Sequence, residues 1–166
     1  SMLQNVSERT IWRYRELLPC SKNAKEISLG EGGTPLHKAI RLSSILGANL
    51  LLKDESRNPT GSFKDRAISV AVTWAAEQGA KRLVSASSGN AAAAVAAYSS
   101  KAGLDCFLLF DSKSPPTKHL QPLVFGARGL VVKGLFTGTP RDLSELLYAL
   151  SQRLDAYNIF CWALIN

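Results

Sequence analysis

One lysine stands where a helix is predicted to begin. Lys64 belongs to the segment NPTGSFKDR at residues 58–66, which joins a predicted strand to a predicted helix. Ser62 is predicted to cap that helix, with Asp65 as the reciprocal capping residue, so Lys64 falls in the first helical turn. The positive end of the helix dipole disfavours an ammonium there, and the neutral amine is the form that attacks an aldehyde. The alternative is an ordinary surface lysine beside Asp65.

A second segment, SASSGN at residues 85–90, ends one predicted strand and opens an alanine-rich helix. Helix starts carry unpaired N–H groups, and small residues let a ligand approach them. Open parallel sheets also bind ligands outside the carboxyl ends of their strands. These residues therefore predict a site for a carboxylate or a phosphate, although capping of the helix by Ser88 or Asn90 explains them as well.

A third segment, LGEGGTPL at residues 29–36, contains three glycines. Glycines gathered in this way indicate unusual backbone angles or the close approach of another part of the chain. The segment lacks the spacing and the lysine of a phosphate-binding P-loop. On its own residues it is predicted to be a structural turn.

The elements that position these segments alternate between strand and helix from residue 49 onward. Short β-branched or leucine-rich runs predict strands, and apolar residues at helical spacing predict the helices between them. This alternation is typical of a three-layer α/β protein, with helices on both faces of a parallel sheet. We expect strands at residues 49–54, 82–86, 104–110, 130–133 and 159–163, and helices at residues 62–78 and 90–102, with two more beginning at Pro115 and Thr139.

The helix that begins at Thr139 has Asp142 as its predicted reciprocal capping residue. Its leucines share one face, which we expect to pack on the core rather than to form a dimer zipper: Leu143, Leu146, Leu147, Leu150 and Leu154. Near the other end of the chain, an apolar pattern from Ile11 predicts a helix that stops before Pro19.

Composition describes an ordinary globular chain. The 166 residues are 46% hydrophobic and 20% charged, which argues against disorder and permits one domain with a buried core. The net charge of +7 is spread along the chain, so we expect no nucleic-acid partner. Apolar runs are interrupted before the ~20 residues that a membrane helix needs, so we expect no membrane partner either.

The three cysteines, Cys20, Cys106 and Cys161, lie far apart. Their spacing fits no metal motif, and their odd number does not suggest a disulfide framework. We therefore expect reduced thiols, no bound metal and a cytoplasmic location.

Together the three segments resemble the pyridoxal-phosphate enzymes of fold type II, and among them the threonine synthases. Residues 29–36 are similar to that family's GEGGTPL segment, and residues 58–66 to its NPTGSFKDR segment. Residues 87–98 are similar to its SGN loop and the helix that follows. Order and spacing agree too, and the resemblance extends over nearly the whole chain from about residue 11.

The resemblance implies a role for each matching residue. Lys64 would carry pyridoxal 5′-phosphate as a Schiff base, Phe63 would wall the cofactor site, and Asn90 would bind the ring hydroxyl of the cofactor. The carboxylate of a small anionic amino-acid substrate would be held by Ser87, Ser88 and Gly89. The implied reaction converts O-phosphohomoserine and water to threonine and phosphate.

The same resemblance implies that part of the enzyme is missing. In this family the cofactor phosphate and the ring nitrogen are bound by residues far downstream, which have no counterpart here. We expect residues 1–80 to contribute to a large cofactor domain and residues 81–166 to form a small α/β domain, with the remainder of the large domain absent. Such a fragment would bind the cofactor weakly and be inactive alone, and a homodimer is left open.

Two other interpretations fit the same residues. A serine or threonine dehydratase of this fold shares the lysine and the SGN elements, although Asp65 and residues 29–36 favour threonine synthase. A non-catalytic fragment, kept as a binding module, would retain the motifs as structure. Cofactor binding by the chain would argue against the module.

Overall fold

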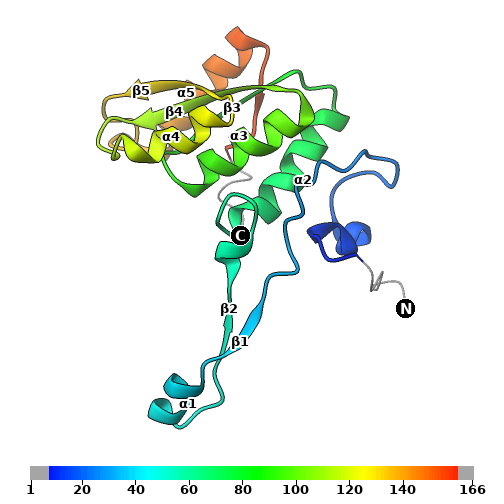
Figure 1. Cartoon of the computed structure of the whole chain (residues 1–166). Coiled ribbons are helices and arrows are strands. Elements are labelled where there is room, and N and C mark those ends of the chain that lie inside the picture. The colour runs from blue at the N-terminus through cyan, green and yellow to red at the C-terminus, as the bar shows by residue number, and fades with distance from the viewer. Residues whose placement is uncertain (1–7, 161–166) are drawn as a thin grey trace.

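The computed structural model describes residues 8–160 and contains a parallel sheet with helices on both sides (Figure 1). The strand order is β5–β4–β3–β6. The four strands are β3 (Arg82–Ala86), β4 (Asp105–Asp111), β5 (Arg128–Val132) and β6 (Tyr157–Asn158). All neighbours pair in parallel. The main helices are α2 (Lys64–Glu77), α3 (Asn90–Ala102), α4 (Thr117–Val124) and α5 (Pro140–Leu154).

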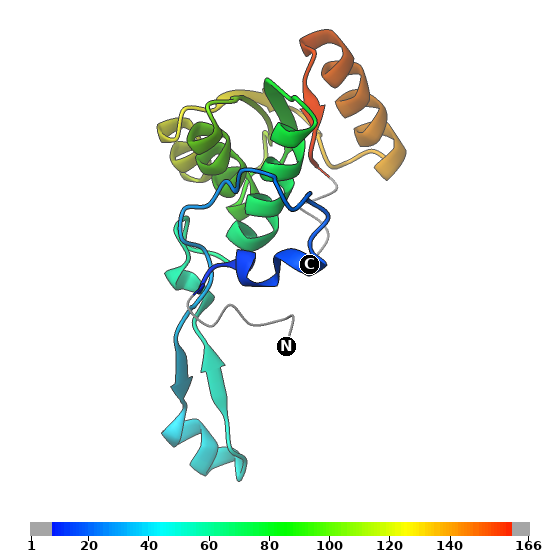
Figure 2. The same ribbon diagram turned by 90° about the vertical axis from the view of Figure 1, so that its right-hand side faces the viewer.

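Side chains of the strands alternate between two cores, one on each face of the sheet. Leu83 and Leu108 pack with residues of α2 and α3 on one face. Val84 and Leu109 pack with Leu147 of α5 on the other. Figure 2 shows α5 across the sheet from α3 and α4. The predicted three-layer α/β class is therefore confirmed.

Helix α5 begins with the predicted capping box. The Thr139 hydroxyl accepts from the Asp142 N–H at 3.3 Å, and the Asp142 carboxylate accepts from the Thr139 N–H at 2.6 Å. Leu147 is fully buried, and Leu143 and Leu150 pack beside it, so this part of the leucine face belongs to the core. Leu146 lies outside that contact and is 38% exposed.

Residues 36–53 form an arm that projects from the body (Figure 1). The arm consists of β1 (Leu36–Lys38), α1 (Ile40–Leu46) and β2 (Leu51–Lys53), and β1 pairs antiparallel with β2. The strand predicted at residues 49–54 is present in part, but its predicted place in the parallel sheet is wrong. A short leucine run indicates a strand without indicating its partner, which explains the error.

The N-terminal segment packs along α2. Its helix η1 (Ile11–Leu17) stops before Pro19 as predicted, although it is a 3₁₀-helix. The buried Trp12 indole donates to the Ser69 hydroxyl of α2 at 3.0 Å.

At the other end of the chain, β6 ends at Asn158, before the strand predicted at residues 159–163 begins, so the described residues 159 and 160 of that prediction are not part of a strand. Residues 161–163 of that prediction, with Cys161, lie outside the described residues. Within residues 8–160, Cys20 and Cys106 are free thiols, no helix is long and apolar enough to cross a membrane, and no cluster of metal-ligating side chains occurs.

Candidate active site

The lysine turn, residues 58–66, lies between the arm and α2. Gly61 has a φ of 86°, a left-handed conformation that favours glycine. Lys64 is the first residue of α2 and is half-buried. Its ammonium lies 4.9 Å from the ring centre of Phe63, which is 44% exposed. The turn therefore presents an amine beside an accessible aromatic face.

The predicted cap of this helix is wrong in detail. Phe63, rather than Ser62, is the N-cap and makes no capping bond, but the Ser62 hydroxyl accepts from the Lys64 N–H at 3.3 Å. The fully buried Asp65 carboxylate accepts from the hydroxyl of Thr60 at 2.9 Å and from its N–H, in addition to the predicted bond from the Ser62 backbone. Asp65 thus closes the turn that precedes Lys64, and burial raises the pKa of its carboxyl.

An ion pair joins the lysine turn to η2 (Glu55–Arg57), the short 3₁₀-helix after the arm. The Arg66 guanidinium donates to both oxygens of Glu55 at 2.8 Å, and the Thr34 hydroxyl donates to Glu55 at 2.7 Å. The bonds from Arg66, followed by those from Thr34 and Asn58, lower the pKa of Glu55 to about 2. Because Thr34 belongs to residues 29–36 and bonds to Glu55, the pair also holds that segment against the lysine turn.

The glycines of the glycine loop, residues 29–36, have the unusual backbone predicted for them. Gly30, Gly32 and Gly33 all have positive φ. A Cβ at Gly32 would lie 2.7 Å from the Arg9 carbonyl oxygen. The N-terminal segment can therefore pack this closely only because residue 32 has no side chain. The Gly32 N–H donates to the Asn58 side-chain oxygen at 3.0 Å, a second link between the loop and the lysine turn.

Three fully buried side chains connect the glycine loop, the lysine turn and α3. The Tyr98 hydroxyl of α3 donates to Glu31 at 3.0 Å and also interacts with Asp65. Glu31 further accepts from the Ser28 hydroxyl at 2.9 Å. Burial, with the two neighbouring carboxylates, raises the pKa of Tyr98, so its hydroxyl keeps its proton as a donor.

The serine turn, residues 87–90, follows β3. The Ser88 hydroxyl accepts from the Asp111 N–H at 2.8 Å, and the Ser87 hydroxyl accepts from the Gly89 N–H at 3.3 Å. Gly89 is the N-cap of α3 and no side chain caps that helix. Capping by Ser88 or Asn90 therefore does not account for these residues, and the N–H groups of the first turn of α3 face the end of the sheet where ligands bind.

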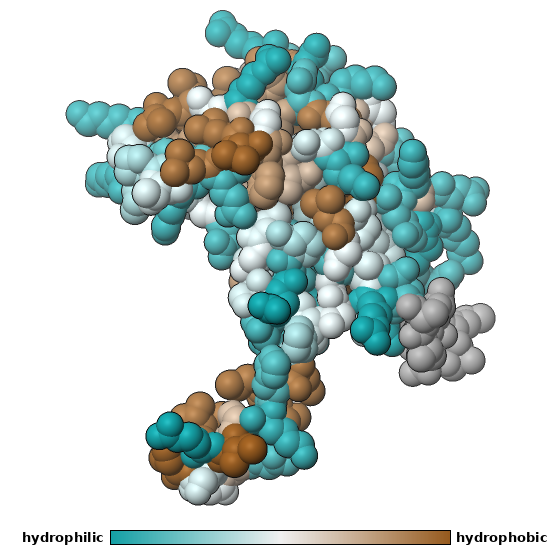
Figure 3. Space-filling model, in the orientation of Figure 1, coloured by the Kyte–Doolittle hydropathy of each residue, from teal (hydrophilic) through white to brown (hydrophobic). Residues whose placement is uncertain are grey.

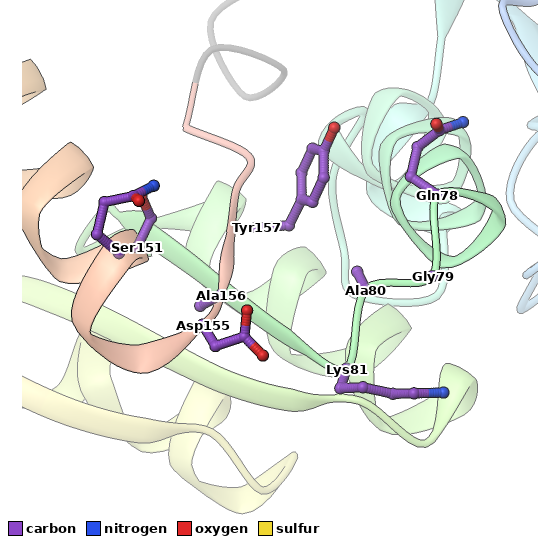
Figure 4. Close-up of a pocket in the computed structure, with 9 residues that line it drawn as sticks. Gln78, Gly79, Ala80, Lys81, Ser151, Asp155, Ala156 and Tyr157 are labelled. Atoms are coloured by element: carbon purple, nitrogen blue, oxygen red, sulfur yellow. The ribbon is translucent and has the colours of Figure 1, made fainter.

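A pocket of about 370 Å³ lies between the serine turn and α4. Gln121 lines it and also donates to the Thr60 carbonyl oxygen at 3.2 Å, so the pocket is linked to the lysine turn. Another pocket, of about 240 Å³, lies between residues 78–81 and the end of α5 (Figure 4). This second pocket borders the starts of β3 and β6, at the opposite edge of the sheet from the serine turn. Because open parallel sheets bind ligands at the carboxyl ends of their strands, we assign the site to the pocket beside the serine turn.

Hydrogen bonds join the lysine turn to α3 and to α4 through residues that the sequence did not single out. Glu31, Tyr98 and Gln121 form these links, and Glu31 lies 67 positions from Tyr98. Glu31 was the one local signal for these links in the sequence. It is an acid among glycines, and a carboxylate buried in a tight loop needs several hydrogen-bond donors from elsewhere.

The residues present fit a planar aldehyde cofactor. Lys64 supplies a half-buried amine, the part-exposed Phe63 supplies an apolar wall, and Asn90 lines the pocket between the serine turn and α4. A rigid turn on either side would keep such a ligand oriented.

The model of the family described as "Pyridoxal-phosphate dependent enzyme" matches residues 27–160. The chain therefore belongs to this family of cofactor-dependent enzymes. Among its relatives, threonine synthase of Methanocaldococcus jannaschii is 44% identical over 128 residues, covering 76% of this chain and 32% of that protein. Threonine synthase of Halalkalibacterium halodurans is 42% identical over 124 residues, covering 74% and 35%. The chain spans about a third of the length of these curated relatives.

Solved structures agree on the fold. An O-ureido-L-serine synthase superposes with a TM-score of 0.71 at 20% identity, covering 84% of this chain and 44% of that one. Threonine deaminase isoform 2 from Solanum lycopersicum gives 0.63 at 24% identity, covering 76% and 34%. At these identities the likeness describes the fold alone.

Proposed function

We propose that this chain forms the lysine-bearing part of a threonine synthase, which converts O-phosphohomoserine and water to threonine and phosphate. The observation that carries the proposal is the identity of 42 to 44% with threonine synthases over three quarters of the chain. The serine or threonine dehydratase stays the second candidate, and its support, the likeness to threonine deaminase, is one of fold.

In this proposal each residue of the site has a separate task. Lys64 binds the aldehyde of pyridoxal 5′-phosphate, and its amine holds and returns a proton once substrate has replaced it. Phe63 shields one side of the cofactor, and Asn90 orients it through the ring hydroxyl. Bound there, the cofactor would supply an electron sink for negative charge on the substrate carbon.

The substrate carboxylate is assigned to the serine turn. The first-turn N–H groups of α3 lack a side-chain cap, and the dipole of that helix favours an anion. The contributing residues are Ser87, Ser88 and Gly89. The Ser88 hydroxyl accepts from the Asp111 N–H, so its own O–H and the backbone N–H of Ser88 both stay available as donors to a carboxylate.

A hybrid enzyme tests the function. Residues of the M. jannaschii threonine synthase that match this chain would be replaced by their counterparts here, and phosphate release from O-phosphohomoserine would be measured. We expect release that Lys64→Ala abolishes. Formation of a 2-oxo acid from threonine without phosphate release would favour the dehydratase, and a folded hybrid that binds cofactor but performs neither reaction would favour the binding module.

The chain alone is expected to bind the cofactor weakly and to release no phosphate. Charge-assisted hydrogen bonds contribute on the order of 1.5 to 3 kcal/mol each, so a site without several of them loses powers of ten in affinity. Titration of the 166-residue chain with cofactor tests this. Saturable micromolar binding together with phosphate release would contradict it.

A further inference from the structure

The pocket beside the serine turn has walls of two different kinds. Of its six described lining residues, Gly89, Asn90 and Ala93 come from the serine turn and α3, while Thr117, Lys118 and Gln121 come from α4. Its volume of about 370 Å³ falls in the range of small-molecule sites. A ligand in it would therefore touch the start of α3 on one side and α4 on the other.

The chemistry of the α4 wall selects an anion. Lys118 contributes an ammonium, Thr117 a hydroxyl and Gln121 an amide that can donate. None of the six described lining residues is acidic, so no carboxylate in the lining competes with a ligand for the lysine. Lysine acts as a compact point charge and is a common partner of phosphate groups.

Hydrogen bonds tie this wall to the rest of the site. Gln121 donates to the Thr60 carbonyl oxygen, and Thr60 in turn donates to Asp65, the residue after Lys64. Asp111, at the end of β4, donates its N–H to Ser88 in the serine turn. The Asp111 carbonyl oxygen also accepts from the Ser114 hydroxyl, which bonds to His119 of α4. The α4 wall is therefore hydrogen-bonded to the lysine turn and, through residues 111–119, to the serine turn.

We propose that Lys118 and Thr117 form a subsite for a phosphate monoester, and that this subsite holds the phosphate of the substrate. The inference rests on the proposed function. The substrate named there carries two anionic groups, and its carboxylate is assigned to the serine turn. The pocket leads from that turn to Lys118, so the second anion of a ligand seated in it meets the one ammonium of the lining.

The 166-residue chain is titrated with O-phospho-L-homoserine and with L-homoserine, while amide NMR signals and calorimetry report binding. We expect O-phospho-L-homoserine to move the signals of Thr117 and Lys118. Lys118→Gln should weaken its affinity about tenfold, as loss of one charge-assisted hydrogen bond would, and Thr117→Val should weaken it less. L-homoserine should bind more weakly and show no dependence on Lys118.

Lys113→Gln is the matched control, since Lys113 is also exposed and precedes the same helix but does not line the pocket. Both lysines are on the surface, so both variants should fold. Equal affinity of Lys118→Gln and Lys113→Gln for O-phospho-L-homoserine, or binding that leaves the signals of α4 unmoved, would overturn the subsite.

A second arm separates the two sources of a phosphate monoester. Affinities for pyridoxal 5′-phosphate and for pyridoxal are compared in wild type and Lys118→Gln. If the variant selectively loses affinity for the phosphorylated cofactor, the phosphate at Lys118 belongs to the cofactor and the assignment to substrate is overturned. Equal losses, or none, support the substrate.

Failure of this inference differs from failure of the proposed function. If Lys118 has no effect while the hybrid enzyme releases phosphate, only the subsite falls. If O-phospho-L-homoserine binds in a Lys118-dependent way while the hybrid releases no phosphate, the subsite stands and the reaction is wrong.

Discussion

The glycine loop and the lysine turn differ sharply from the arm that separates them in sequence. Around the lysine turn polar groups are buried, with Glu31 and Asp65 fully so, and each carboxylate accepts hydrogen bonds: Glu31 from Ser28 and Tyr98, Asp65 from Thr60. On the arm apolar groups face outward, with Ile40 at 77% and Ile45 at 74% exposure. Figure 3 shows hydrophobic surface at the end of the arm.

The base of the arm explains how the two regions coexist. The Asp54 N–H donates to the Pro35 carbonyl oxygen at 2.9 Å, and the Thr34 hydroxyl donates to Glu55 at 2.7 Å. These bonds join the two chain segments at the base of the arm, where the arm leaves and rejoins the body. The site is therefore held together at the base of the arm, while the arm itself is exposed. Changes in the two regions should have separable effects.

The largest effect is expected at Lys64. Lys64→Ala removes the amine that would bind the cofactor, so borohydride reduction in the presence of pyridoxal 5′-phosphate should no longer attach it to this chain. Peptide mapping after reduction is the measurement, with Lys81→Ala as an exposed control. Attachment at Lys53, Lys81 or another lysine in the wild-type chain would show that the assignment is wrong.

A methyl group in the glycine loop should be the most costly small change. Gly32→Ala combines a φ of 110° with a Cβ 2.7 Å from a backbone oxygen, so we expect a loss of about 3 kcal/mol in the free energy of unfolding. Gly30→Ala, at φ 91° with open space around its Cβ, should lose only about 1 kcal/mol. Urea unfolding measures both, and equal losses would mean that the contact with Arg9 is not tight.

The acid limit of stability should depend on Glu55. Its folded-state pKa of about 2 is below the ordinary value of 4.5, so its contribution is complete above about pH 4.5 and is lost as the pH falls toward 2. The contribution is roughly 2 kcal/mol after allowance for partial exposure. The free-energy difference between wild type and Glu55→Gln should therefore shrink on acidification. A difference independent of pH would contradict this role of the ion pair with Arg66.

Tyr98→Phe tests the buried link between the glycine loop, the lysine turn and α3. It removes the donor to Glu31 while keeping the ring, and we expect a loss of about 1.5 kcal/mol, typical of a hydrogen bond to a charged group. Tyr148→Phe, at a tyrosine 65% exposed on α5, should change stability by less than about 0.5 kcal/mol. Borohydride trapping at Lys64 should fall in Tyr98→Phe and not in Tyr148→Phe, because Tyr98 bonds to Asp65 of the lysine turn and Tyr148 lies on the exposed face of α5.

Local signals in the sequence sufficed for much of this assembly. The capping pair Thr139 and Asp142 defines the start of α5, and Gly103 defines the end of α3, because both act through their immediate neighbours. Capping residues and apolar periodicity likewise placed Lys64 and the serine turn at the starts of helices. The division into domains at residue 80 stays a prediction.

Long-range pairing is what the sequence could not supply. Helix α1 and strand β1 were missed because the arm buries no apolar face, and hydrophobic periodicity is the signal from which such elements are predicted. For Asp65 the sequence predicted the backbone of Ser62 as partner and missed Thr60 and Tyr98, which also bond to its carboxylate. The bond from Tyr98 to Glu31 joins segments with no local cue for each other.

The smallest effect on stability is expected on the arm, where the effect on association should be largest. Ile40 and Ile45 are each about three-quarters exposed, so replacing both with lysine should change the free energy of unfolding by less than about 0.5 kcal/mol. An exposed apolar cluster favours contact with another surface, and two added charges oppose that contact. Sedimentation over a range of concentrations should show weaker self-association in the double variant.

Val124→Lys, at a valine 81% exposed on α4, controls for an added charge elsewhere. Self-association that falls equally in both variants would place the contact outside the arm, and a double variant that unfolds readily would mean that the arm shares the stability of the body.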